Sequence, residues 1–324
     1  MIEKYYDGAI EQVAAGLGTV EKNYLLVRYS GQFSVENLND TKQLEKNEDI
    51  FVQVHEFETG EITCAYEPYL TMICDGFRRY MTGTFEEFME TCDVYYLHRP
   101  VLLGYFNQDN TGREEIILLD EVAYEQERML AALERMLCAI ADRHPVLFVL
   151  NRFQLASKST MQLTARFLKR ENCNIGLVLG VSDIQAMPEF LVPDWEMLYE
   201  TLDDGSKIYH IGNSGRKKEE TIDDEKYVDY GSEKVYRKLQ NMVEFLDFDQ
   251  AAYYLETIER KIKFDNLLVD DAARFRMWLL FVKVSILRQD IPKALEICED
   301  LEKIHLAGKE EECAYAVSYT HLRA

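Results

Sequence analysis

The fold of this chain is decided by residues 144–183, HPVLFVLNRFQLASKSTMQLTARFLKRENCNIGLVLGVSD. Two runs in this stretch, VLFVLN at 146–151 and IGLVLG at 175–180, contain almost no polar residue. Such runs are typical of parallel strands that are covered on both faces. We therefore expect these two strands to lie at the centre of a parallel sheet.

Helical segments surround the first of these strands. Apolar residues recur at helical spacing over 121–143, and Pro145 ends that helix before the strand begins. A second helix is predicted over 159–170, with Ser157 or Ser159 placed to cap it. The order helix, strand, helix, strand predicts a right-handed crossover in an α/β fold.

Three further β-rich runs extend the predicted sheet. They are YLLVRY at 24–29, IFVQV at 50–54 and KIYHI at 207–211. Strands that alternate with helices favour a layered α/β domain with a largely parallel sheet. We assign this domain to residues 1–213.

Length and charge bound the possible functions. The chain has 324 residues, enough for two domains. Its 36 basic and 58 acidic residues give a net charge of −22, which disfavours direct binding to nucleic acid or to an anionic membrane surface. No apolar run is long enough to span a bilayer and no signal peptide is recognisable, so we expect a cytoplasmic protein.

Residues 214–232 are polar and mixed in charge, and they predict a linker before an all-α region at 233–316. A repeat occurs in that region at an offset of 43 residues. Its first copy, Asp247, Phe248, Ala251, Leu255 and Ile258, corresponds to Asp290, Ile291, Ala294, Cys298 and Leu301. These segments resemble tetratricopeptide repeats, which implies a helical-repeat domain that binds proteins. The aromatic residues Tyr253, Tyr254, Phe275 and Trp278 are the candidate contacts, although an aromatic stripe at helical spacing is more often part of the repeat core.

The end of the chain differs in character. Residues 317–324, VSYTHLRA, look like a translated sequencing adaptor and not like native sequence. We therefore expect the natural protein to continue beyond about residue 316, with an output domain outside this chain.

The stretch at 144–183 also resembles the centre of signal-transducing P-loop ATPases (STAND and AAA-like), which precede helical repeats in many bacterial regulators. In a working member the strand ends in a carboxylate that holds magnesium, and a second acidic residue polarises the attacking water. The matching positions are Asn151 and Arg152, a neutral amide and a cation. Gln154 matches a glutamine common in the family but does not replace the carboxylate.

The phosphate-binding positions depart from the family in the same direction. A P-loop needs GxxxxGK[ST] after the first strand. Here SGQFSVENLND follows it, with Ser30, Gly31, Ser34 and Val35 in the degenerate loop. After the fourth strand, Asp183 stands where active relatives carry a neutral or basic residue, and its charge would repel a phosphate.

The resemblance therefore implies a pseudo-ATPase, a non-enzymatic regulatory or scaffold segment of a bacterial signalling protein. We expect no cofactor and no catalytic residue, with ATP possible but not expected. Its partner is another protein, or its own output domain, bound by the helical repeats. Cysteines and histidines lack metal-site spacing, so no metal is predicted. The alternative is a switch that binds ATP or ADP and controls an output such as a DNA-binding helix-turn-helix or a diguanylate cyclase.

Overall fold

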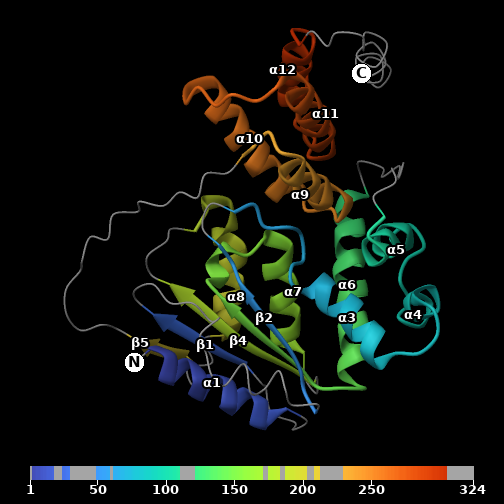
Figure 1. Cartoon of the computed structure of the whole chain (residues 1–324), viewed down its shortest axis with the longest axis vertical. Helices are drawn as coiled ribbons and strands as arrows, with labels where there is room; N and C mark the ends of the chain where they lie inside the picture. The colour runs from blue at the N-terminus through green and yellow to red at the C-terminus, as the bar shows by residue number, and fades with distance from the viewer. Residues whose placement is uncertain are drawn as a thin grey trace. The chain divides into compact units, whose positions relative to one another are not determined.

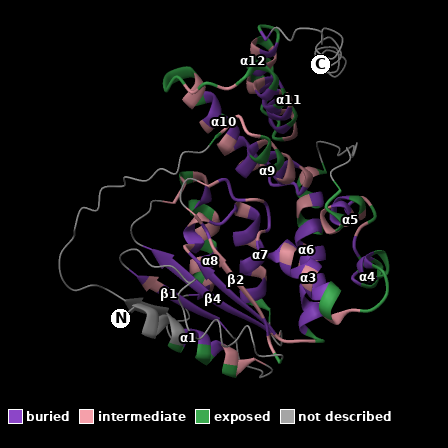
Figure 2. Cartoon of the chain, viewed as in Figure 1, coloured by how far each residue is buried: buried purple, intermediate pink, exposed green. Residues whose placement is uncertain are grey.

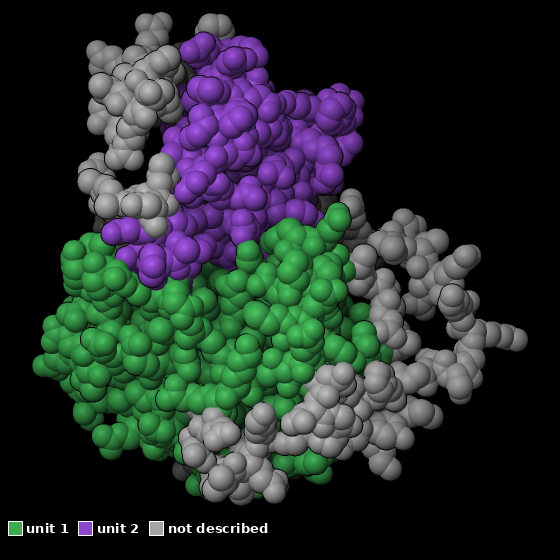
Figure 3. All heavy atoms as spheres, turned by 180° about the vertical axis from the view of Figure 1, so that it is seen from behind, with its two compact units in different colours: residues 1–114, 127–226 green, residues 115–126, 227–324 purple. Residues whose placement is uncertain are grey.

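A computed structural model describes residues 2–17, 24–29, 49–58, 61–109, 121–170, 174–182, 187–202, 208–211 and 229–304. The chain divides into two compact units, coloured separately in Figure 3. Unit 1 contains residues 1–114 and 127–226, and unit 2 contains residues 115–126 and 227–324.

Unit 1 is built on a five-stranded sheet in the order β2-β3-β4-β1-β5. Every pair of neighbouring strands is parallel. The strands are β1 (Tyr24–Tyr29), β2 (Phe51–Glu56), β3 (Val146–Asn151), β4 (Ile175–Ser182) and β5 (Ile208–Ile211). The unit is therefore an α/β structure with a parallel sheet, as the sequence predicts, and β3 and β4 lie inside it (Figure 1).

Helices complete unit 1. They are α1 (Ile2–Gly16), α3 (Tyr69–Tyr80), α4 (Phe85–Thr91), α5 (Arg99–Asn107), α6 (Val122–Ala141, its first turn in unit 2), α7 (Lys158–Lys169) and α8 (Val192–Leu202). Two short 3-10 turns, η2 (Phe153–Leu155) and η3 (Glu189–Leu191), follow β3 and precede α8.

The two faces of the sheet are covered by different helices. Successive side chains of a strand point to opposite faces, so β3 contributes to both layers. Val149 belongs to the core that includes Ile10 and Val13 of α1. Phe148, its neighbour, packs edge-on against Tyr69 of α3, with ring centroids 4.7 Å apart. All six residues of β3 are buried, which explains why its first five are apolar. Figure 2 shows that buried residues dominate the neighbouring strands β1 and β4 as well.

The predicted helices around β3 lie close to their expected bounds. Helix α6 ends at Ala141, and Pro145 follows before β3 begins. Helix α7 begins at Lys158, where the side chain of Ser157 accepts a hydrogen bond from the backbone N–H of Thr160. The cap is therefore Ser157, and Ser159 lies inside the first turn.

Unit 2 contains four described helices, α9 (Glu233–Glu244), α10 (Phe248–Phe264), α11 (Asp271–Leu287) and α12 (Ile291–Leu301). The turns α9–α10 and α11–α12 have the same backbone conformation. Leu246 and Gln289, 43 positions apart, have φ angles of 65° and 61°. The next residue donates its N–H to a carbonyl five positions earlier, at 2.7 Å for Asp247 and 2.8 Å for Asp290. The 43-residue offset is thus present in the backbone as well as in the sequence.

Parts of the chain that the sequence analysis singled out lie outside the described residues. They include most of the predicted linker at 214–232 and all of the tail at 317–324. Within the described ranges, none of the helices combines the length and the apolar character needed to cross a bilayer.

Candidate functional site at the carboxyl edge of the sheet

The strand order marks one place on the sheet where a ligand would be expected. From β1 the chain passes to β2 at the far edge, and later connections return in the opposite direction through β3 and β4 to β5. Right-handed connections that run in opposite directions leave the sheet on opposite faces. In open α/β sheets, ligands bind outside the carboxyl ends of the strands at such a switch point. The candidate site therefore lies where β1, β3 and β4 end.

Two side chains meet across this edge. The hydroxyl of Tyr29, the last residue of β1, donates a hydrogen bond of 2.6 Å to Oδ1 of Asn151, the last residue of β3. Strand β4 lies between them, and its Ser182 pairs with Tyr29 in the sheet register. Tyr29 is 1 % exposed and Asn151 is fully buried.

Burial keeps the Tyr29 hydroxyl protonated. Its desolvation raises the pKa of Tyr29 to about 12, although the Arg152 guanidinium and the hydrogen bond to Asn151 act in the opposite direction. A neutral hydroxyl is a donor, and the Asn151 amide oxygen is the acceptor it reaches. The side-chain oxygen of Asn151 is therefore engaged with a tyrosine of the same chain.

A charged pair adjoins this hydrogen bond. Arg152 follows Asn151 in the left-handed region, with φ at 53°, and its Nη2 lies 3.3 Å from Oε1 of Glu56. Glu56 is the last residue of β2 and pairs with Asn151 in the sheet register. Their side chains are 24 % and 16 % exposed, so the pair is only partly screened by solvent. The carboxylate nearest to Asn151 on the neighbouring strand is thus neutralised by Arg152.

Gln154 has a different role at the same edge. Its Nε2 donates to the carbonyl of Ser182 at 3.1 Å, and its Oε1 accepts the N–H of Ser182 at 3.3 Å. Ser182 is the last residue of β4, and Gln154 is 3 % exposed. The Gln154 side chain therefore forms two hydrogen bonds with the backbone of Ser182, as a neighbouring strand would. Both the nitrogen and the oxygen of its amide group are used in these bonds.

The other predicted positions of the degenerate nucleotide site lie outside the described residues. They are Ser30, Gly31, Ser34, Val35 and Asp183. Two residues of this site, Tyr29 and Glu56, were not predicted from the sequence. Tyr29 ends a strand whose bounds the sequence predicts, and the carboxyl ends of parallel strands share one edge, so this position could have identified it. Glu56 lies two residues beyond the predicted end of its strand and had no such signal.

The partner-binding candidates of unit 2 separate into two kinds. Tyr253 and Tyr254 are half-buried on α10, with ring centroids 5.4 Å apart. Phe275 and Trp278 on α11 are 6 % and 3 % exposed. Phe275 and Trp278 are therefore core residues of the helical unit, and Tyr253 and Tyr254 are the two candidates that stay partly accessible.

Among the residues that the structure describes, no three or more His, Cys, Asp and Glu side chains gather as a metal site would require. At the candidate site itself, the Asn151 amide, the Tyr29 phenol, the Arg152 guanidinium and the Glu56 carboxylate interact with one another.

Comparisons with protein family models, with curated proteins and with solved structures give no match to this chain.

Proposed function

We propose that this chain is a non-hydrolysing regulatory protein, in which the sheet unit is a structural platform and the helical unit binds a protein partner. One observation carries the proposal. The carboxyl edge of the sheet, where a nucleotide would bind, is occupied by the hydrogen bond between Tyr29 and Asn151 and by the ion pair of Arg152 with Glu56.

The physical argument concerns charge. Magnesium bound to a triphosphate needs anionic oxygen ligands, and hydrolysis needs an acidic group that orients water. Asn151 supplies a neutral oxygen that already accepts a hydrogen bond. Displacing the Tyr29 hydroxyl would break a buried interaction, and recruiting Glu56 would leave Arg152 without that carboxylate. Both changes oppose binding.

The helical unit supports the second half of the proposal. Its two hairpins share a 43-residue offset in both sequence and turn geometry, which is the organisation of helical-repeat proteins. Its resemblance to tetratricopeptide repeats favours protein partners. The net charge of −22 disfavours nucleic acid. The described cysteines are thiols and not disulfides, which fits the cytoplasm.

The test is calorimetric titration of the full chain with ATP and with ADP, each with and without magnesium, together with a phosphate-release assay. We expect no heat of binding up to millimolar nucleotide and no release above the buffer rate. The variant Tyr29→Phe, which removes the hydroxyl from the edge of the sheet, is titrated in parallel as the matched control. Magnesium-dependent binding in the micromolar range by the unmodified chain would overturn the platform proposal.

A second candidate function is a nucleotide-dependent switch, and one observation favours it. The Arg152–Glu56 pair is partly exposed, so an incoming phosphate could attract Arg152 and release the Glu56 carboxylate for magnesium. The switch would then control an output domain outside this chain, such as a helix-turn-helix or a diguanylate cyclase. Glu56→Gln separates the two: it abolishes magnesium-dependent binding in a switch and changes no binding in a platform.

A further inference from the structure

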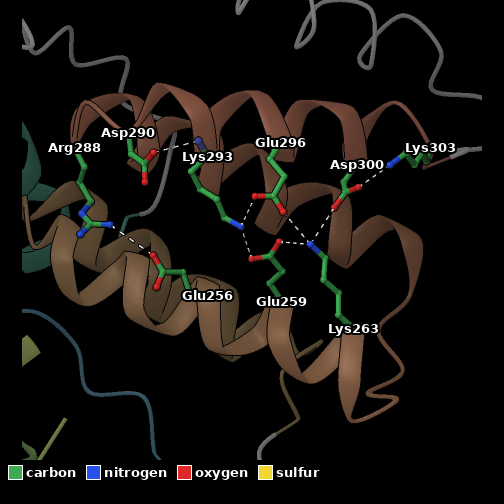
Figure 4. Close-up of polar contacts among 9 residues, drawn as sticks. All are labelled: Glu256, Glu259, Lys263, Arg288, Asp290, Lys293, Glu296, Asp300 and Lys303. Carbon is green, nitrogen blue, oxygen red and sulfur yellow. Dashed lines mark hydrogen bonds and ion pairs between the residues drawn. The ribbon is translucent and has the colours of Figure 1, made fainter. Parts of the chain in front are cut away.

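Two lysines between α10 and α12 are matched by carboxylates of the same unit. Nζ of Lys263 lies 2.7 Å from Oε1 of Glu259 and 3.1 Å from Oε1 of Glu296. Nζ of Lys293 lies 2.7 Å from Oε2 of Glu259 and 3.0 Å from Oε2 of Glu296. Figure 4 shows this closed arrangement, in which each ammonium group meets both glutamates. The two lysines are therefore neutralised within the helical unit.

The exposed side of α11 has the opposite charge balance. It is formed by residues that follow one another three or four positions apart, a spacing that keeps them on one side of a helix. They are Arg276, Leu279, Lys283 and Ile286, two exposed cations and two half-buried apolar residues. Within α11 the one acidic residue is Asp271, the first residue of the helix. We call these four residues the α11 stripe.

The neighbouring helix α9 supplies one carboxylate to this stripe. Oε2 of Glu233 lies 2.8 Å from Nη1 of Arg276, and its Oε1 lies 3.3 Å from Nε of Arg237. These two arginines share the carboxylate, and their hydrogen bonds lower the pKa of Glu233. Among the described residues, no carboxylate forms an ion pair with Lys283. The three cations therefore meet a single carboxylate.

This excess of positive charge is local, because the whole chain has a net charge of −22. Charges farther apart than about 8 Å are largely screened at physiological ionic strength, so a ligand at the stripe responds mainly to the adjacent cations. Tyr236 of α9 adds an aromatic ring, whose centroid lies 5.1 Å from the Arg276 guanidinium. Arginine and tyrosine are enriched at the centres of protein interfaces. The composition of the stripe therefore favours an acidic protein segment as its ligand.

We propose that the α11 stripe binds an α-helix of a partner protein that carries two acidic residues seven positions apart, with an apolar residue between them. Arg276 and Lys283 are themselves seven positions apart, a rise of about 10.5 Å along the helix. On a partner helix laid along α11, acidic residues at that spacing lie on one side and at the same separation. The apolar residue would contact Leu279. This inference rests on the proposed function and deepens it, because it names the surface and the partner chemistry.

The probe is a labelled, alanine-rich helical peptide with two glutamates seven positions apart and a leucine between them. Its binding to the full chain is measured by fluorescence anisotropy, and a small interface predicts a dissociation constant of roughly 10–100 µM. Lys283→Glu should weaken binding about five- to tenfold, because an attraction becomes a repulsion. Lys303→Glu is the matched control: it changes the net charge equally, and Lys303 lies beyond the end of α12, with its side chain 71 % exposed.

Two altered peptides test the pairing and the spacing. A peptide with lysine in place of one glutamate should regain affinity for the Lys283→Glu chain. A peptide whose glutamates are five positions apart should bind the unmodified chain about fivefold more weakly, because its carboxylates lie on different sides of the helix. Raising the salt concentration from about 0.05 M to about 0.5 M should weaken binding several-fold. Circular dichroism confirms that each variant is folded and that each peptide is helical.

Five results would overturn the inference. They are no binding of the helical peptide, equal binding to the unmodified and Lys283→Glu chains, equal binding of the two glutamate spacings, binding that appears only after residues 305–324 are removed, and a self-associated chain that Lys283→Glu makes monomeric. The last two would make the chain's own end or a second copy the occupant. Failure of the platform proposal has a different signature, namely magnesium-dependent nucleotide binding that Lys283→Glu leaves unchanged.

Discussion

The Tyr29 hydroxyl and the Asn151 amide oxygen, 122 residues apart in sequence, are joined by a buried hydrogen bond of 2.6 Å across the width of one strand. This contact lies at the carboxyl edge of the sheet, at its topological switch point. It gives the side-chain oxygen of Asn151, at the end of β3, a hydrogen-bond donor from the protein itself. A site built for nucleotide would leave that position accessible to the ligand.

Removing this hydroxyl should lower stability. Tyr29→Phe keeps the ring in the core and deprives the Asn151 oxygen of this donor, so the free energy of unfolding should fall by about 1–3 kcal/mol. Urea denaturation followed by circular dichroism measures it. Tyr96→Phe is the control, since Tyr96 is 63 % exposed and should change the value by less than about 0.5 kcal/mol. Equal stability of both variants would contradict a structural role for the contact.

Alkaline pH should weaken the same edge. The pKa of Tyr29 is raised by burial from 10.0 to about 12. Because the folded state favours the neutral phenol, the stability from this group is complete below pH 10 and is lost as the pH rises through 12. The measurement is a denaturation series from pH 8 to 12, with Tyr29→Phe in parallel. The stability gap between the two chains should narrow over that window, and a constant gap would count against this assignment.

The strands of the sheet could be predicted because their signal is local. The run of buried apolar residues at 146–150 is recognisable without knowledge of the neighbouring strands. The predicted bounds of β2 and β4 were two residues short at the carboxyl end. Glu56 joins its strand through pairing with Asn151, and Ser182 joins through pairing with Tyr29, so these residues become strand only in the assembled sheet.

The candidate site was predicted in part for the same reason. Asn151 and Gln154 lie in the local pattern after a strand, whereas Tyr29 and Glu56 reach the site only through the strand order. In unit 2, sequence alone did not separate core from surface aromatics. Trp278 lies on the buried side of α11, and the exposed Arg276 and Lys283 lie on the opposite side of that helix.

The ion pairs between α10 and α12 should contribute unequally. Glu259 is 8 % exposed and lies 2.7 Å from the ammonium groups of both Lys263 and Lys293. Glu259→Gln should cost about 2 kcal/mol, less than for a fully buried pair because both lysines retain Glu296. Glu256→Gln, at an exposed glutamate 3.7 Å from Arg288, should cost less than about 0.5 kcal/mol. Thermal denaturation in low and in 1 M salt compares them, and a smaller loss for Glu259→Gln would contradict the ranking.

The two equivalent turns of unit 2 should respond to glycine in opposite directions. Leu246 and Gln289 both have left-handed backbones, in which a side chain costs about 1–2 kcal/mol and glycine costs nothing. Gln289 is exposed, so Gln289→Gly relieves the strain without losing contacts and should raise the free energy of unfolding by about 0.5–1 kcal/mol. Leu246 is 2 % exposed, so Leu246→Gly also removes a buried side chain and should lower it by about 2–4 kcal/mol.

The control for this pair is Gln289→Ala, which keeps the left-handed strain and should leave stability within about 0.5 kcal/mol of the unmodified chain. Urea denaturation of the three variants gives the order Gln289→Gly, then Gln289→Ala, then Leu246→Gly. If Gln289→Gly were no more stable than Gln289→Ala, the left-handed turn at the second repeat would not be the conformation in solution.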